Sequence, residues 1–171
     1  MTENRKGAAF ARTLMIVLVR VDDRLLHGQI VCSWVPYIKA NALIIASDAA
    51  AGDSIVRGIM ASCGHGGLSV EVESVDDVIR YIPAGADGDS KAILIVGELG
   101  DAMRIYEAGM RFRSLNIGNI HHEQDGRTLS PSVIINGEDE AIIERFEDAG
   151  VKIDIRDVPT SVAVAYARRP R

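Results

Sequence analysis

The sequence is poor in cysteine and has no long apolar run. Two cysteines, Cys32 and Cys63, occur among 171 residues, and both have small or apolar neighbours. This pattern excludes the dense disulfide framework of a small secreted domain and is typical of reduced thiols in the cytoplasm. No apolar run reaches the roughly 18 residues that a membrane-spanning helix needs. We therefore expect a cytoplasmic protein without a transmembrane segment.

The sequence also lacks an excess of positive charge and a regularly spaced set of metal ligands. Its net charge is -5, which argues against a nucleic-acid partner. Cys63 and His65 have no second pair of ligands nearby, so no zinc site is expected. His121, His122 and Glu123 are further candidate ligands, but adjacent histidine side chains point apart. We interpret these three residues as part of a solvated loop and expect no metal.

The chain is long enough to form one domain with a substantial core. Residues 1–12 are polar and basic and lack the apolar segment of a secretory signal. We therefore expect residues 1–13 to form a disordered extension and residues 14–171 to form a single domain.

Strand-like apolar runs alternate with helical spacing along the chain. This predicts an α/β fold, a single three-layer domain with an open, mostly parallel sheet and helices on both faces. Strands are expected at residues 14–19, 42–46, 68–72, 91–96, 114–117, 133–135 and 151–155, with an edge strand at 162–166. Helices are expected at residues 28–40, from 48 or 53 to 63, 75–82, 101–110 and 138–149. Loops are expected at residues 84–90 and at 118–130, the second with room for a hairpin around Asp125 and Gly126.

The most informative segment follows the first predicted strand. Residues 20–29 read RVDDRLLHGQ, so an apolar strand leads directly into two carboxylates, two guanidinium groups and one imidazole. In an open α/β sheet, ligands bind at the loops that leave the carboxyl ends of the strands. Arginine beside histidine suits a phosphate, because the guanidinium holds the oxyanion while a ring nitrogen can attack phosphorus.

Five residues of this segment receive predicted roles. His27 is the predicted nucleophile, since a neutral imidazole is nucleophilic. Arg24 is predicted to hold phosphate oxygens with its planar fork, and Arg20 to supply a second anion contact. Gly28 would let backbone amides at a helix start approach the anion. Asp22 is predicted to orient the imidazole or an arginine, because two adjacent carboxylates cannot both face a phosphate.

Plainer interpretations of the same residues stay open. His27 could pack at a helix start and form only a local hydrogen bond. Arg24 could be a surface residue that pairs with Asp22 or Asp23. Cys32, five positions after His27, is expected in the core, because no neighbour would activate its thiol.

Residues 19–29, VRVDDRLLHGQ, resemble the active-site segment of the mannose/sorbose-class IIB components of the bacterial sugar phosphotransferase system. The resemblance extends to IIASD at residues 44–48, SLNIG at 114–118 and RDVP at 156–159, and so covers the chain from about Leu14 onward. One departure follows Gly118, where the family pattern has a second glycine and this chain has Asn119.

The resemblance implies a phosphotransferase that acts as a phosphocarrier. His27 would accept a phosphoryl group from a histidine of a IIA partner and pass it to a sugar held by membrane IIC and IID subunits during uptake. Arg24 would neutralise the phosphoryl group in both transfers, which consist mostly of positioning and charge stabilisation. No metal or organic cofactor is implied, and the formation of a homo-oligomer is left open.

Two other functions also stay open at this point. The chain could be a regulatory module that binds partners according to its phosphorylation and does not transport sugar. It could also be a small-ligand α/β enzyme that uses the same loop to hold a phosphorylated metabolite.

Overall fold

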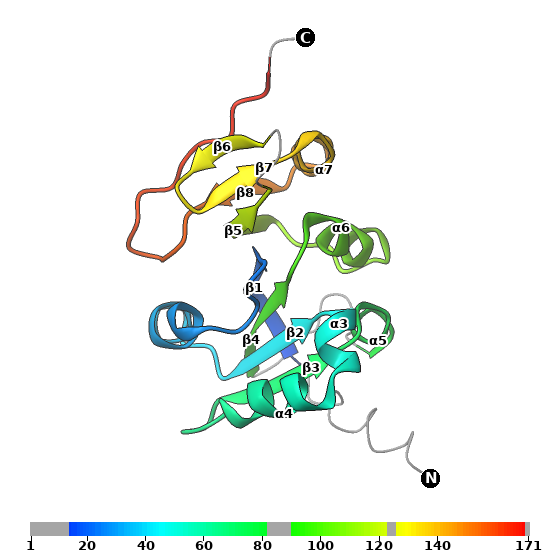
Figure 1. The fold of residues 1–171 in the computed structure, drawn as a ribbon, viewed down its shortest axis with the longest axis vertical. Helices are drawn as coiled ribbons and strands as arrows, with labels where there is room; N and C mark the ends of the chain where they lie inside the picture. The colour runs from blue at the N-terminus through cyan, green and yellow to red at the C-terminus, as the bar shows by residue number, and fades with distance from the viewer. Residues whose placement is uncertain (1–13, 82–89, 123–125, 170–171) are drawn as a thin grey trace.

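The sheet runs through the whole molecule and carries helices on both faces (Figure 1). The computed structural model describes residues 14–81, 90–122 and 126–169. The predicted extension at residues 1–13, residues 84–89 of one predicted loop, Glu123 and Asp125 lie outside the described residues.

The strands follow the order β3-β2-β4-β1-β5-β7-β6, and β8 also pairs with β5. Their bounds are β1 Leu14–Asp22, β2 Ala42–Ala46, β3 Ser69–Glu73, β4 Ser90–Val96, β5 Ser114–His121, β6 Arg127–Ser130, β7 Val133–Ile135 and β8 Lys152–Ile155. All these pairs are parallel except β6 with β7. The central strands contain long apolar runs, at residues 14–19 of β1, 42–46 of β2 and 92–96 of β4, which is typical of parallel strands covered on both faces.

The helices are the π-helix η1 Ile30–Trp34 and the α-helices α2 Val35–Ile38, α3 Asp48–Gly52, α4 Ser54–Ser62, α5 Val75–Tyr81, α6 Leu99–Glu107 and α7 Gly137–Asp148. Two cores result, because successive side chains of a strand point to opposite faces. Ile93 and Ile95 of β4 pack with η1, α3 and α4, while Leu94 packs with α5, α6 and α7. Figure 1 shows η1 and α2 on one side of the sheet and α5 to α7 on the other. The predicted α/β class and three-layer architecture are confirmed.

The predicted loop at residues 118–130 is largely wrong. Strand β5 continues to His121, and residues 127–130 form β6. The observed hairpin joins β6 to β7, so its turn lies at residues 131–132 and not around Asp125 and Gly126. Asn119 and His121 are polar, and polar residues favour a loop over a buried strand. Here both side chains are bonded to Asp23, so the strand can continue through them.

Smaller differences concern the ends of elements. Strand β1 extends to Asp22, beyond the predicted end at residue 19. The helix predicted at residues 28–40 contains a π-helical turn and ends at Ile38, with Lys39 in the left-handed conformation. The predicted edge strand at 162–166 is reduced to a single bridge between Ile155 and Val164. Cys32 was expected in the core but is exposed.

Among the described residues, no helix combines the length and the apolar character that crossing a membrane requires.

Candidate active site

The site begins where β1 ends, at the carboxyl edge of the sheet. Strand β1 finishes at Asp22, and the chain turns at once, with the Leu25 amide donating to the Asp22 carbonyl over 2.9 Å. Leu25 has a φ of +54°, a conformation that L-residues adopt at a steric cost. Its side chain packs against the core on the η1 face. The turn is therefore fixed, and it presents His27 directly before the helical segment.

Asp22 is the centre of the site. Its side chain is completely buried and accepts hydrogen bonds from three neighbours. The Oδ2 atom lies 2.9 Å from His27 Nε2 and 2.8 Å from Arg20 Nη2. The Oδ1 atom lies 3.2 Å from Arg24 Nε and also accepts from the Arg24 amide. The structure thus brings together four of the residues singled out in the sequence.

The carboxyl group of Asp22 stays ionised at neutral pH. Burial acts to raise its pKa, but the hydrogen bond from His27 and the charge of Arg20 outweigh burial and lower the pKa from 3.8 to about 2. An ionised carboxylate can only accept hydrogen bonds. His27 Nε2 must therefore carry the proton in this contact, which leaves the Nδ1 lone pair of the neutral ring available for reaction.

Arg24 and Gly28 border the imidazole. The Arg24 side chain is 44% exposed, and its Nη2 atom donates to Gln29 Oε1 over 3.0 Å. A Cβ atom added to Gly28 would meet no atom within 4 Å outside its two chain neighbours, so the space around this glycine is open. The His27 side chain is 17% exposed, so solvent reaches part of it.

Arg20 lies beneath Asp22, where it has no exposed surface. The sequence predicted a direct anion contact, but the guanidinium is engaged by Asp22, by Asn116 Oδ1 and by the Arg156 carbonyl. It also lies over the Trp34 ring, 5.3 Å from the ring centroid. Burial lowers the pKa of Arg20, although the charge of Asp22 opposes this. In this arrangement Arg20 is bonded to Asp22 and is not exposed at the surface of the site.

The second carboxylate, Asp23, is turned toward the end of β5. Its Oδ1 atom accepts from Asn119 Nδ2, and its Oδ2 atom lies 3.2 Å from the His121 amide and 3.3 Å from His121 Nδ1. The negative charge of Asp23 would repel a phosphoryl group, and these contacts hold the carboxylate at the end of β5. Asn119 stands at the position where the sequence departs from the family pattern, and here it is a partner of Asp23.

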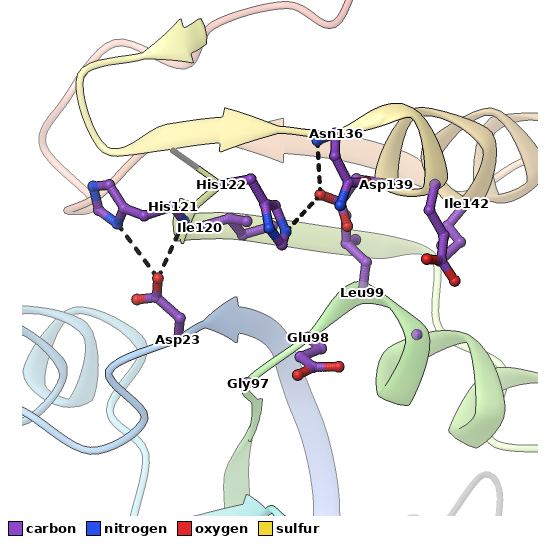
Figure 2. Close-up of a pocket in the computed structure, with 12 residues that line it drawn as sticks. Asp23, Gly97, Glu98, Leu99, Ile120, His121, His122, Asn136, Asp139 and Ile142 are labelled. Atoms are coloured by element: carbon purple, nitrogen blue, oxygen red, sulfur yellow. Dashed lines mark hydrogen bonds and ion pairs between the residues drawn. The ribbon is translucent and has the colours of Figure 1, made fainter. Parts of the chain in front are cut away.

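A pocket of about 230 Å³ opens beside Asp23, between the ends of β1, β4 and β5 and the start of α7. Figure 2 shows His121 reaching toward Asp23 and His122 toward Asp139. Asp139 belongs to the capping box of α7 with Asn136, and burial raises its pKa although the hydrogen bond with Asn136 opposes this. The two histidines thus face different carboxylates. Both line the pocket, and each side chain is less than half exposed to solvent.

Among the residues that the structure describes, no group of three or more His, Cys, Asp or Glu side chains is arranged to hold a metal ion. Cys32 and Cys63 are both free thiols.

Comparison with known proteins identifies the family of the chain. The family model described as the phosphotransferase (PTS) system sorbose subfamily IIB component matches residues 16–167. The chain belongs to this family. It is therefore a phosphotransferase and a phosphocarrier in sugar uptake, as the resemblance implied.

Individual relatives agree with the family assignment. The chain is 30% identical over 149 residues to the N-acetylgalactosamine-specific phosphotransferase enzyme IIB component 2 of Escherichia coli, covering 87% of this chain and 94% of that protein. It is 24% identical to the mannose-specific EIIAB component of the same species, over 86% of this chain and 46% of that protein. The crystal structure of the IIBSor domain of the sorbose permease from Klebsiella pneumoniae superimposes with a TM-score of 0.80 at 25% identity, covering 88% and 92% of the two chains.

Sequence reasoning missed the residues that support the site from below, namely Asn116, Trp34 and Arg156. A signal was available for Asn116, because a polar residue between Leu115 and Ile117 interrupts a buried apolar strand. A buried polar side chain is expected to have a hydrogen-bond partner. Trp34 and Arg156 gave no comparable signal.

Proposed function

We propose that His27 is the residue that carries the phosphoryl group, on its Nδ1 atom. The observation behind this proposal is the 2.9 Å contact between His27 Nε2 and the buried carboxylate of Asp22. That contact fixes the proton on Nε2 and leaves Nδ1 as the nucleophile. Once Nδ1 bonds to phosphorus, the ring becomes cationic, and Asp22 stabilises that charge.

The donor is a phosphohistidine of a IIA partner. In the first transfer a bond forms between His27 Nδ1 and phosphorus as the donor's nitrogen–phosphorus bond breaks. In the second, a sugar hydroxyl oxygen attacks phosphorus, the bond to His27 breaks and the hydroxyl proton leaves to solvent. We propose that membrane IIC and IID subunits hold this sugar and that both transfers occur in the cytoplasm. The similarity to an EIIAB component, whose name joins an A and a B part, supports the IIA partner.

The neighbouring residues then have distinct roles. Arg24 has an exposed guanidinium within the site and neutralises the phosphoryl oxygens during transfer. Gly28 leaves room for those oxygens beside the ring. Asp22 orients His27, and Arg20 holds Asp22 in place from below.

The test is phosphorylation with phosphoenolpyruvate, the general phosphotransferase proteins and a IIA donor. The wild-type chain should gain one phosphate that is labile in acid and stable in base, and His27→Ala should gain none. The matched control is His65→Ala, which removes an exposed histidine that precedes β3 and should label normally. Thermal melts followed by circular dichroism should show that both variants are folded.

Labelling that persists in folded His27→Ala, or that maps to His65, His121 or Cys32, would contradict the assignment. The second transfer needs membranes that carry the IIC and IID subunits, and the labelled chain should lose its phosphate there only when sugar is added. A phosphorylated chain that is not discharged under any of these conditions would favour the regulatory function.

A further inference from the structure

Three polar side chains form a row across three neighbouring strands below the site. Arg20 of β1 is in register with Asn116 of β5, and Asn116 is in register with Asp154 of β8. The Asn116 Oδ1 atom accepts from Arg20 Nη1, and its Nδ2 atom lies 3.0 Å from the Asp154 carbonyl oxygen. Asn116 therefore connects the arginine beneath the site to the far strand of the sheet.

Arg20 has few positions available to it. The side chain has no exposed surface, and its guanidinium contacts Asp22, Asn116 and the Arg156 carbonyl while it covers the Trp34 ring. A cation in such surroundings cannot move without losing hydrogen bonds that water would not replace.

Gly118 provides the space in which that guanidinium lies. The register between β1 and β5 shifts here, since Val21 pairs with Ile117 and Asp22 with Asn119, which leaves Gly118 without a partner on β1. A Cβ atom at this position would overlap the guanidinium of Arg20. Because Arg20 is buried and bonded on its other sides, any side chain at residue 118 would push it away from Asp22.

We propose that Asn116 and Gly118 are positioning residues for phosphoryl transfer. Together they hold the guanidinium of Arg20 against Asp22, so that Asp22 Oδ2 meets His27 Nε2 and the Nδ1 atom keeps its lone pair. This inference rests on the proposed role of His27. It assigns the choice of the reactive nitrogen to two residues of β5 that touch neither the imidazole nor the phosphoryl group.

The first experiment measures the ring tautomer of His27 by ¹⁵N NMR and needs no phosphate donor. In the wild-type chain the neutral ring should carry its proton on Nε2. Gly118→Ala should displace Arg20 and give a mixture of the two tautomers. Gly58→Ala is the matched control, because a Cβ atom on this residue of α4 would meet no atom within 4 Å. That variant should keep the wild-type tautomer.

The second experiment measures the rate of phosphorylation by the IIA donor. Gly118→Ala should slow it by about tenfold or more, because displacing Arg20 and Asp22 misplaces the reacting nitrogen. Asn116→Leu keeps the branched shape of the asparagine side chain but removes the acceptor of Arg20 Nη1, and it should act in the same direction. If Gly118 acts through Arg20, adding Gly118→Ala to an Arg20→Met chain should slow transfer no further.

The outcomes separate this inference from the proposed function. If Gly118→Ala and Asn116→Leu either fail to fold or fold with the wild-type tautomer and rate, the two residues are only structural and the proposal is overturned. If the tautomer shifts as expected but wild-type His27 accepts no phosphate, the positioning role holds and the proposed function fails.

Discussion

The Arg24 side chain is bonded to the site at one edge and exposed to solvent elsewhere. Its Nε atom donates to the buried Asp22, while almost half of the side chain is exposed next to His27. An arginine that is anchored at one edge of its planar group can still offer the remaining N–H donors to a phosphoryl group. The anchored guanidinium also avoids the entropy that a free side chain would lose on binding.

Replacing Arg24 with lysine separates charge from shape. Arg24→Lys retains a cation but loses the fork, so transfer from the IIA donor should slow roughly a hundredfold. The free energy of unfolding should change by no more than about 0.5 kcal/mol, because lysine keeps a cation near Asp22 and the side chain is 44% exposed. Rapid-quench phosphorylation and urea titration measure the two quantities.

Arg80→Lys on α5 is the matched control, since Arg80 is also exposed and pairs with Asp77. It should leave both quantities unchanged. Wild-type transfer in Arg24→Lys would make Arg24 a surface residue without a role in the reaction.

At the scale of elements, the end of β5 gives its two histidines different neighbours. His121 contacts Asp23 beside the site, whereas His122 contacts Asp139 in the capping box of α7. His121→Ala should loosen Asp23, let its charge approach the phosphoryl group and slow transfer, with little change in melting temperature. His122→Ala should cost about 0.5 kcal/mol of stability, because the His122 ring is 41% exposed and solvent screens its pair with Asp139, and it should leave transfer unchanged.

Each histidine variant serves as the control for the other. Measuring the phosphorylation rate and the melting temperature of both variants shows whether His121 affects transfer and His122 affects stability. Equal effects of both substitutions on the rate would mean that the strand end acts as one unit and that the separate pairings have no consequence.

The sequence allowed most elements to be predicted, because buried parallel strands and amphipathic helices have distinct periodicities. The run that became β2 is apolar throughout, β4 is apolar at residues 92–96, and both strands were expected within one residue of their observed bounds. The error at residues 118–130 arose where polar residues continue a strand. Asn119 is buried there and bonded to Asp23, and Gly118 is buried there and leaves space for Arg20. The local sequence pattern does not reveal either of these long-range contacts.

The sequence predicted only those residues of the candidate site that lie close together along the chain. Arg20 to Gly28 lie close in sequence, so a short segment revealed their chemistry. The contact between Arg20 and Asn116 spans 96 positions and depends on the register of two strands. The burial of Arg20 was not predicted either, because the first strand was expected to end at residue 19, and it continues to Asp22.

At the scale of the whole molecule, the ionised Asp22 links the site to stability in acid. The pKa of Asp22 is lowered to about 2 in the folded chain, from 3.8. A lowered pKa adds stability that is complete above pH 4 and is lost as the pH falls toward 2. The loss should be on the order of 2 kcal/mol, at about 1.4 kcal/mol for each pKa unit.

Urea unfolding at stepped pH tests this expectation, and the ¹³C shift of the Asp22 carboxyl group reports its ionisation directly. The group should remain ionised at pH 3 in the folded chain. Titration at or above 3.8 would show that His27 and the arginines do not stabilise the carboxylate.

The indole of Trp34 contacts two cations, with Arg20 5.3 Å and Arg156 5.6 Å from its ring centroid. Its Nε1 atom donates to the Asp157 carbonyl over 2.9 Å. Trp34 is also the sole tryptophan of the sequence. Its emission wavelength therefore depends on the electric field of the charges beneath His27. The chain carries its own optical reporter, through which the charge state of the site can be followed in real time without a label.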